Sequence, residues 1–176
     1  MKEAGGGSLG LFTAIQRLRA IYPYLAGQLA SADIPLYAQH IDRMNLQTLL
    51  QLFRADKNSC LIGTDAVRDG IDVPGQALRM ILYDRVPWPR PDMLFKARAK
   101  WIGKNELTDR LTRMKLRQAF GRLIRRADDK GIFVMLDSRL PTRLTSAFPS
   151  DVTIERLPLA DTLFQVRDFL GRQDEL

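Results

Sequence analysis

The chain has 176 residues, of which 45% are hydrophobic and 27% are charged, values typical of a globular domain long enough to bury a core. Its single cysteine, Cys60, excludes a disulfide framework and an iron–sulfur cluster held by four thiolates of this chain. The net charge of +7 is concentrated in residues 85–126, where 13 Lys or Arg accompany 3 Asp or Glu. This basic block predicts either a polyanionic partner, such as nucleic acid or a nucleotide, or a solvated cationic helix surface.

The first half of the chain alternates between predicted strands and predicted helices. Short apolar runs predict strands at residues 8–13, 34–37 and 59–64. Apolar spacing predicts helices at residues 15–29 and 45–53. Pro23 predicts a kink in the first helix or its end, and Asn45 is a candidate N-cap of the second.

The second half continues the alternation around a proline-rich segment. A polar loop is predicted at residues 65–75, strands at 78–83, 132–136 and 152–157, and helices at 108–126, 142–148 and 161–170. Pro87, Pro89 and Pro91 exclude regular structure in the segment that follows the strand at 78–83. Strands that alternate with helices predict an α/β fold with a mainly parallel sheet and helices on both faces. Ligands of such sheets lie beyond the carboxyl ends of the strands.

The helix predicted at residues 108–126 presents groups that suit a phosphate. Gln118, Arg122 and Arg125 are spaced so that one narrow stripe of a helix carries all three. Gly121 lies beside this stripe and, because it has no side chain, lets a ligand or another backbone approach. Arginine stays charged and has forked donors that match phosphate oxygens. On spacing alone, a solvated basic helix face is the more common explanation.

The loop at residues 65–75 and the end of the preceding strand form a second candidate site. Thr64 offers a hydroxyl, Gly70 lets the backbone pass close to a ligand, and Asp69 and Asp72 offer carboxylates. Asp72 is suited to accept a hydrogen bond from a ribose hydroxyl or to orient an arginine. An ordinary strand-to-helix loop, whose aspartates cap a helix, would have the same composition.

Three segments, in chain order, resemble motifs of the DinG and XPD branch of the superfamily 2 DNA helicases. Residues 118–125, Gln-Ala-Phe-Gly-Arg-Leu-Ile-Arg, resemble motif VI, and residues 6–14 resemble motif IV. Residues 61–75 resemble motif V, usually written Gly-Thr-x-x-x-x-Glu-Gly-Val-Asp-x-Pro-Gly. Two positions depart from that pattern. Asp69 stands where Glu is usual and keeps the charge with a shorter reach. Arg68 is unusual there, and either adds a phosphate contact or faces solvent.

The resemblance runs from about residue 6 to residue 139 and implies a RecA-like three-layer domain, the second motor domain of an ATP-dependent DNA helicase. It implies that two catalytic arginines, Arg122 and Arg125, reach the nucleotide phosphates across a cleft between two motor domains. The other residues expected at the nucleotide are Gln118, Gly121, Gly70, Asp72 and Asp69. The residues expected at the DNA backbone are Thr13, Thr64, Arg68 and Arg85, without sequence-specific contacts.

Two motifs of a complete helicase are absent from this sequence. It contains no Gly-x-x-x-x-Gly-Lys-[Ser/Thr] phosphate-binding loop and no Asp-Glu-x-His. In the family that it resembles, both belong to the N-terminal motor domain, which would hold most of the ATP and the Mg²⁺. We therefore expect residues 1–176 to form a single domain, partnered by that N-terminal domain and by single-stranded DNA, and inactive alone. The alternatives are a nucleic-acid-binding or regulatory module that lacks catalysis, and an α/β domain whose basic helix docks an acidic protein.

The remaining features concern side chains outside these motifs and the location of the protein. His40 is the only histidine and is expected at the surface, so no transition-metal site is predicted. Trp88 is suited to stack on a base or to fill a gap in the core, and the core is favoured. No apolar run reaches the roughly 20 residues of a membrane helix, and residues 1–7 lack a secretory signal. We expect a cytoplasmic, nucleoid-associated protein of DNA repair with no membrane partner.

Overall fold

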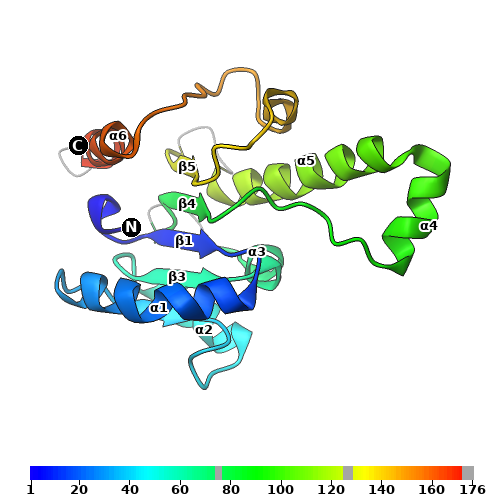
Figure 1. Cartoon of the computed structure of the whole chain (residues 1–176). Helices are drawn as coiled ribbons and strands as arrows, with labels where there is room; N and C mark the ends of the chain where they lie inside the picture. The colour runs from blue at the N-terminus through cyan, green and yellow to red at the C-terminus, as the bar shows by residue number, and fades with distance from the viewer. Residues whose placement is uncertain (74–76, 125–128, 172–176) are drawn as a thin grey trace.

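The computed structural model describes residues 1–73, 77–124 and 129–171. Within these residues, five parallel strands form one sheet of order β2-β3-β1-β4-β5. The strands are β1 (Ser8–Leu11), β2 (Leu36–Ala38), β3 (Cys60–Gly63), β4 (Met80–Tyr83) and β5 (Ile132–Met135). The predicted parallel sheet is therefore confirmed, and all its carboxyl ends lie at one edge of the sheet, on the right in Figure 1.

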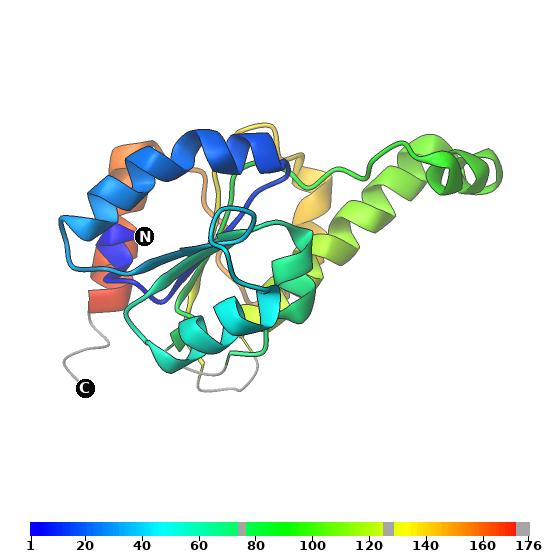
Figure 2. The same cartoon turned by 90° about the horizontal axis from the view of Figure 1, so that it is seen from below.

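Helices cover both faces of the sheet, as predicted. The α-helices are α1 (Ile15–Ala30), α2 (Leu46–Ala55), α3 (Asp65–Gly70), α4 (Met93–Ile102), α5 (Lys104–Leu123) and α6 (Leu159–Gly171). Two 3₁₀ helices are η1 (Lys2–Ala4) and η3 (Thr142–Ala147). Helices α1 and α6 pack on one face, and α2, α3 and α5 pack on the other (Figure 2).

The strand sequences explain this three-layer arrangement. Side chains alternate across a strand, so both faces of a parallel sheet must be apolar. Leu61 of β3 points into the core beneath α2 and α3, whereas its neighbour Ile62 packs with Leu18 of α1 on the opposite face. Register places Leu9 of β1 between Leu61 and Ile81 of the adjacent strands. These residues are fully buried, so the middle of the sheet is a rigid base for the loops at its carboxyl edge.

An arm projects from that carboxyl edge. It comprises residues 84–113: the proline-rich connection, α4 and the first half of α5 (Figure 1). Asp92 caps α4 by accepting a hydrogen bond from the backbone N–H of Phe95 at 2.7 Å. Gly103, at φ 92°, separates α4 from α5. Leu116, Ala119 and Leu123 bury the second half of α5 in the core, so the arm is an extension of a helix anchored on the sheet.

Several predicted elements differ from the structure. The loop predicted at 65–75 contains the short helix α3, because Arg68 forms an ion pair with Asp65 one turn earlier. The strand predicted at 152–157 is wrong: these residues form no strand, and Arg156 donates instead to the Leu140 carbonyl at 2.7 Å.

The helices also differ in detail from the predictions. Helix α4 was not predicted, because most of its apolar side chains face solvent and give no amphipathic pattern. Pro23 lies on the exposed side of an uninterrupted α1, and Asn45 caps α2 as expected through the Thr48 N–H at 2.9 Å. Among the described helices, none is long and apolar enough to cross a membrane.

Candidate functional site

A groove of about 590 Å³ lies between the carboxyl edge of the sheet and the arm. The sheet contributes Thr13 after β1, His40 after β2 and Thr64 after β3 to its wall. The arm and the adjoining turn of α5 contribute Trp88, Arg90, Arg98 and Lys115. Segments far apart in the sequence therefore bring two hydroxyls, an indole and three cations to one groove, which we call the edge groove.

The two threonines of the edge groove are held by buried polar side chains. The Thr13 N–H donates to Asp84 Oδ1 at 2.9 Å, and Arg17 Nε donates to Asp84 Oδ2 at 2.6 Å. The Thr64 N–H and hydroxyl donate to Gln39 Oε1 at 2.9 and 3.1 Å. Because Asp84 and Gln39 are themselves buried, both threonines have fixed positions at the ends of their strands.

The aromatic and basic lining of the edge groove was predicted only in part. Trp88 is 39% exposed, so the favoured core position is wrong and the indole faces the groove. His40 is exposed, as expected. Arg90 and Arg98 belong to the basic block but were not singled out, because charge alone does not reveal which members face a common groove. Arg85 is exposed and lies outside the residues that line it.

The second candidate site lies where α5 meets α3, that is, where motif VI meets motif V. Arg122 Nη2 donates to the backbone carbonyl of Asp69 at 3.3 Å. Gln118 lies one turn earlier on α5 and is exposed. Asp69 and Asp72 are exposed beside this contact. One polar, partly basic surface therefore joins two segments about fifty positions apart in the sequence. We call it the motif V–VI face, and it comprises Asp69, Asp72, Gln118 and Arg122.

The two glycines of this surface differ in their surroundings. A side chain built on Gly121 would meet nothing within 4 Å among the described residues, so the space beside the stripe is open. On Gly70, a Cβ would lie 3.2 Å from Leu50 Cδ1 of α2. Gly70 therefore allows α3 to pack closely on α2, whereas Gly121 leaves room for an approaching group.

The structure describes two of the three side chains in the predicted stripe, Gln118 and Arg122. Helix α5 ends at Leu123, and Ile124 is extended at φ −116° and ψ 113°. Ile124 therefore does not continue the predicted helix, and Arg125 lies outside the described residues. Gln118 and Arg122 are the two members that share one helical face.

Arg68, an expected DNA contact, is buried and paired within α3. Its Nη1 donates to Asp65 Oδ1 at 3.0 Å and its Nη2 to Asp69 Oδ1 at 2.8 Å. Burial lowers the pKa of this guanidinium, but the hydrogen bond to Asp69 and the interactions with Tyr83 and Asp65 together outweigh that effect and raise it. Only 5% of Arg68 is exposed, so in this conformation its guanidinium binds its own helix and not the edge groove.

A chain of polar contacts runs from the edge groove to the motif V–VI face. Lys115, in the groove wall, lies 2.9 Å from Asp65 Oδ2. Arg68 joins Asp65 to Asp69, and the Asp69 carbonyl accepts from Arg122. Burial raises the pKa of the Tyr83 hydroxyl to about 12, although the nearby Arg68 guanidinium opposes the rise. We use the name Arg68 relay for the five connected residues Lys115, Asp65, Arg68, Asp69 and Arg122.

Asp137 holds the base of the arm. The Val86 N–H donates to Asp137 Oδ2 at 3.2 Å, and Arg139 Nε donates to Asp137 Oδ1 at 2.9 Å. The side-chain hydrogen bond from Arg139 lowers the pKa of this carboxyl to about 2. Asp137 therefore remains ionised throughout the neutral range and fixes the start of the proline-rich connection.

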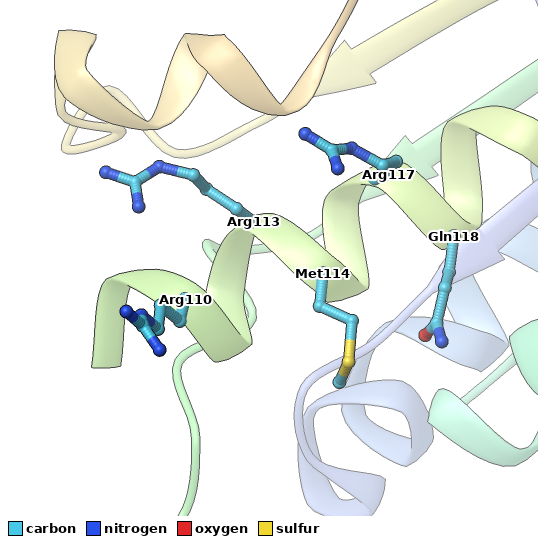
Figure 3. Close-up of a pocket in the computed structure, with 5 residues that line it drawn as sticks. All are labelled: Arg110, Arg113, Met114, Arg117 and Gln118. Carbon is cyan, nitrogen blue, oxygen red and sulfur yellow. The ribbon is translucent and has the colours of Figure 1, made fainter. Parts of the chain in front are cut away.

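Part of the basic block of α5 serves the structure of the domain. A shallow depression of about 350 Å³ is lined by Arg110, Arg113, Met114, Arg117 and Gln118. Figure 3 shows Arg113 and Arg117 pointing toward η3, while Met114 and Gln118 point to the opposite side of α5. Arg113 Nε donates to the Arg143 carbonyl at 3.4 Å, and Arg117 Nε to that of Ala147 at 3.5 Å. These two arginines secure η3.

No part of the described chain gathers three or more His, Cys, Asp or Glu side chains in a way that could hold a metal ion. The donor set of the motif V–VI face consists of a guanidinium, an amide and separate carboxylates. Such a set fits phosphate oxygens better than it fits Mg²⁺, which prefers several oxygen ligands around one point.

Comparison with known proteins identifies similar sequences over most of the chain. A family model described as a helicase C-terminal domain matches residues 1–154. The chain is 37% identical over 146 residues to the ATP-dependent helicase DinG of Mycobacterium tuberculosis, covering 79% of this chain and 21% of that protein. It is 33% identical over 148 residues to the 3′-5′ exonuclease DinG of Bacillus subtilis, covering 80% and 16%. The chain thus spans about a fifth of the length of these relatives.

The structure is also similar to a solved structure of XPD in its apo form. The similarity has a TM-score of 0.46 at 19% sequence identity, and covers 75% of this chain and 28% of that one.

Proposed function

The chain belongs to the family of helicase C-terminal domains of the DinG and XPD type, and from this premise we propose that it is the second motor domain of an ATP-dependent DNA helicase. In this proposal the motif V–VI face completes an ATP site that the first motor domain begins, and the edge groove holds single-stranded DNA. The observation that carries the proposal is the hydrogen bond from Arg122 to the Asp69 carbonyl, which sets a motif VI arginine on the exposed end of motif V.

Arg122 has the properties of an arginine that acts on a phosphate from across a domain interface. One donor is anchored on the Asp69 carbonyl, and a guanidinium offers further N–H donors in the same plane. Anchoring fixes its direction before a ligand arrives, which is the condition under which charge stabilisation speeds phosphoryl transfer. Bound ATP supplies the phosphoanhydride bond that is hydrolysed.

The neighbours of Arg122 complete the proposed phosphate face. Gln118 supplies an amide one turn earlier, and the open space at Gly121 admits the opposing domain. By family resemblance Arg125 is the second catalytic arginine, and Asp69 and Asp72 orient arginine or ribose groups. We assign Mg²⁺ coordination to the first motor domain, because the described part of this chain lacks a cluster of suitable ligands.

The edge groove has the chemistry of a non-specific single-strand site. Thr13 and Thr64 offer hydroxyls, Arg98 and Lys115 offer cations, and Trp88 offers a stacking surface. Arg85 is exposed but does not line the groove, so its expected contact with the DNA backbone rests on the family resemblance. Arg68 is not among the proposed DNA contacts, because its guanidinium is buried between Asp65 and Asp69. Its proposed role is to join the two sites through the Arg68 relay as the motor domains close and open.

The edge groove is tested by the salt dependence of DNA binding. Arg98→Gln and Lys115→Gln should each weaken binding of oligothymidylate and make the slope of log K against log salt shallower by about 0.7, the value for one lost phosphate contact on a single strand. Fluorescence anisotropy over a salt series measures both quantities.

The control for this test is Arg110→Gln. Arg110 lies on the same helix as Lys115 and pairs with Glu106 at 2.7 Å, but does not line the edge groove. The Arg110→Gln variant should leave the slope of log K against log salt unchanged. Equal slopes for all three variants and the parent chain would place the DNA elsewhere on the molecule.

A further inference from the structure

Helix α4 exposes an apolar and basic surface at the far end of the arm. Trp101 is 91% exposed and Met93 is 82% exposed, the two most exposed of the large hydrophobic side chains that the structure describes. Residues 93–105 contain four Lys or Arg and no Asp or Glu. Phe95 is the buried residue of α4 and anchors the helix, so the outward side of the helix lacks a partner within the described chain.

Trp101 lies on the same side of α4 as two residues that line the edge groove. Leu94, Arg98 and Trp101 are separated by four and three residues, which brings them within about 60° of one another around a helix. Leu94 and Arg98 line the edge groove. The stripe therefore leads out of the groove and reaches Trp101, which lies about 10 Å from Leu94 and about 4.5 Å from Arg98 along the helix axis.

We propose that this stripe extends the proposed DNA site and that Trp101 is a stacking platform for a base of single-stranded DNA beyond the edge groove. The inference rests on the proposed function of the groove. An exposed aromatic ring beside cations is the arrangement by which proteins bind single strands without reading sequence. Lys100 and Lys104 flank Trp101 in the sequence and supply charge for the adjoining phosphates.

The charge of the surface favours a nucleic acid over a protein as its occupant. An interface with another protein is usually depleted in lysine at its core, whereas α4 and the residue that begins α5 contribute Lys96, Lys100 and Lys104. The stripe is also continuous with the edge groove, so one polyanion can occupy both without a gap. A polyanion neutralises the cations that an apolar partner would have to bury.

The test uses the fluorescence of Trp101 itself. The chain has two tryptophans, so Trp88→Phe leaves Trp101 as the sole indole. Oligothymidylates from about 4 to about 16 nucleotides, the range of sites that single-strand grooves occupy, are titrated into this variant. Only the longer strands should quench the emission. In the same background, Trp101→Ala should weaken binding of long strands on the order of 10-fold, with little effect on short ones.

Two further variants separate stacking from a general effect on the arm. Trp101→Phe keeps an aromatic face and should recover most of the affinity. Met93→Ala removes an equally exposed side chain from the same helix, off the stripe, and should leave the affinity unchanged.

The outcomes distinguish this inference from the proposed function on which it rests. If Lys115→Gln weakens binding while Trp101→Ala does not weaken it at any length, the platform is disproved and the groove stands. If the parent chain binds no strand of any length, the proposed function fails as well. A shift of Trp101 emission that depends on protein concentration without DNA would overturn the platform in favour of self-association.

Discussion

Replacing Arg122 with alanine is expected to lower kcat for DNA-stimulated ATP hydrolysis by about 10³-fold or more in a helicase that contains both motor domains. Arginines that reach the transferring phosphoryl group from a second domain have effects of this size, because charge builds up on the phosphate oxygens in the transition state. Affinity for ATP should change much less, since the proposed function assigns the phosphate-binding loop and the Mg²⁺ site to the other motor domain. Steady-state hydrolysis with saturating single-stranded DNA measures kcat and KM separately.

Two variants control for this experiment. Arg122→Lys keeps the charge but loses the forked donors, so it should recover only a small part of the rate. Arg110→Ala removes an exposed arginine of the same helix, paired with Glu106, and should leave kcat unchanged. By family resemblance Arg125→Ala should behave as Arg122→Ala does. An Arg122→Ala enzyme with normal kcat would reject the proposed role of motif VI in this chain.

Replacing Arg68 with alanine is expected to lower the free energy of unfolding by about 2–3 kcal/mol. Removing one partner of a buried ion pair usually costs about 3–5 kcal/mol, because the other charge is left without compensation. Here the partners Asp65 and Asp69 are 44% and 60% exposed, and water will solvate them in part, so the loss should be smaller. Urea denaturation followed by circular dichroism measures the change.

The Arg68 relay adds a second expectation to this variant. Without Arg68, Asp69 loses its link to Asp65, and the carbonyl that anchors Arg122 becomes less fixed. DNA stimulation of ATP hydrolysis should therefore fall further than DNA affinity does. Arg68→Met keeps most of the buried volume, so it should recover part of the stability. It should not restore the DNA stimulation of ATP hydrolysis, because it lacks the charged donors that join Asp65 to Asp69. An Arg68→Ala chain as stable as the parent would show that the pairs contribute nothing to the fold.

The sheet and its covering helices could be predicted because their apolar patterns are long and regular. Short buried runs such as residues 60–63 lie in the middle of the sheet, where both faces must be apolar. Helix α4 escaped prediction for the opposite reason, since its apolar residues Met93 and Trp101 face solvent. The false strand at 152–157 has suitable residues, but the chain there crosses the outside of the domain and Arg156 binds the Leu140 carbonyl.

Residues of the candidate sites could be predicted where a sequence motif fixes their place in the fold. They could not be predicted where the packing of the folded chain decides the direction of a side chain. Thr13 and Thr64 follow the strands at 8–11 and 60–63 and so meet at the carboxyl edge. The sequence could not show that Arg68 turns back onto Asp65 and Asp69, because that depends on α3 forming and packing. The sequence likewise could not show that α5 ends at Leu123, three residues before the predicted end of the helix at 126.

The central claim, that this chain supplies half of an ATP site, is tested most directly by its own ATP hydrolysis. The chain is incubated with ATP, Mg²⁺ and saturating single-stranded DNA, and phosphate release is followed over many possible turnovers. We expect no release above the enzyme-free background, because the sequence has no phosphate-binding loop. Sustained turnover by the chain alone, abolished by Arg122→Ala, would contradict the account, since it would mean that this chain holds a complete ATP site.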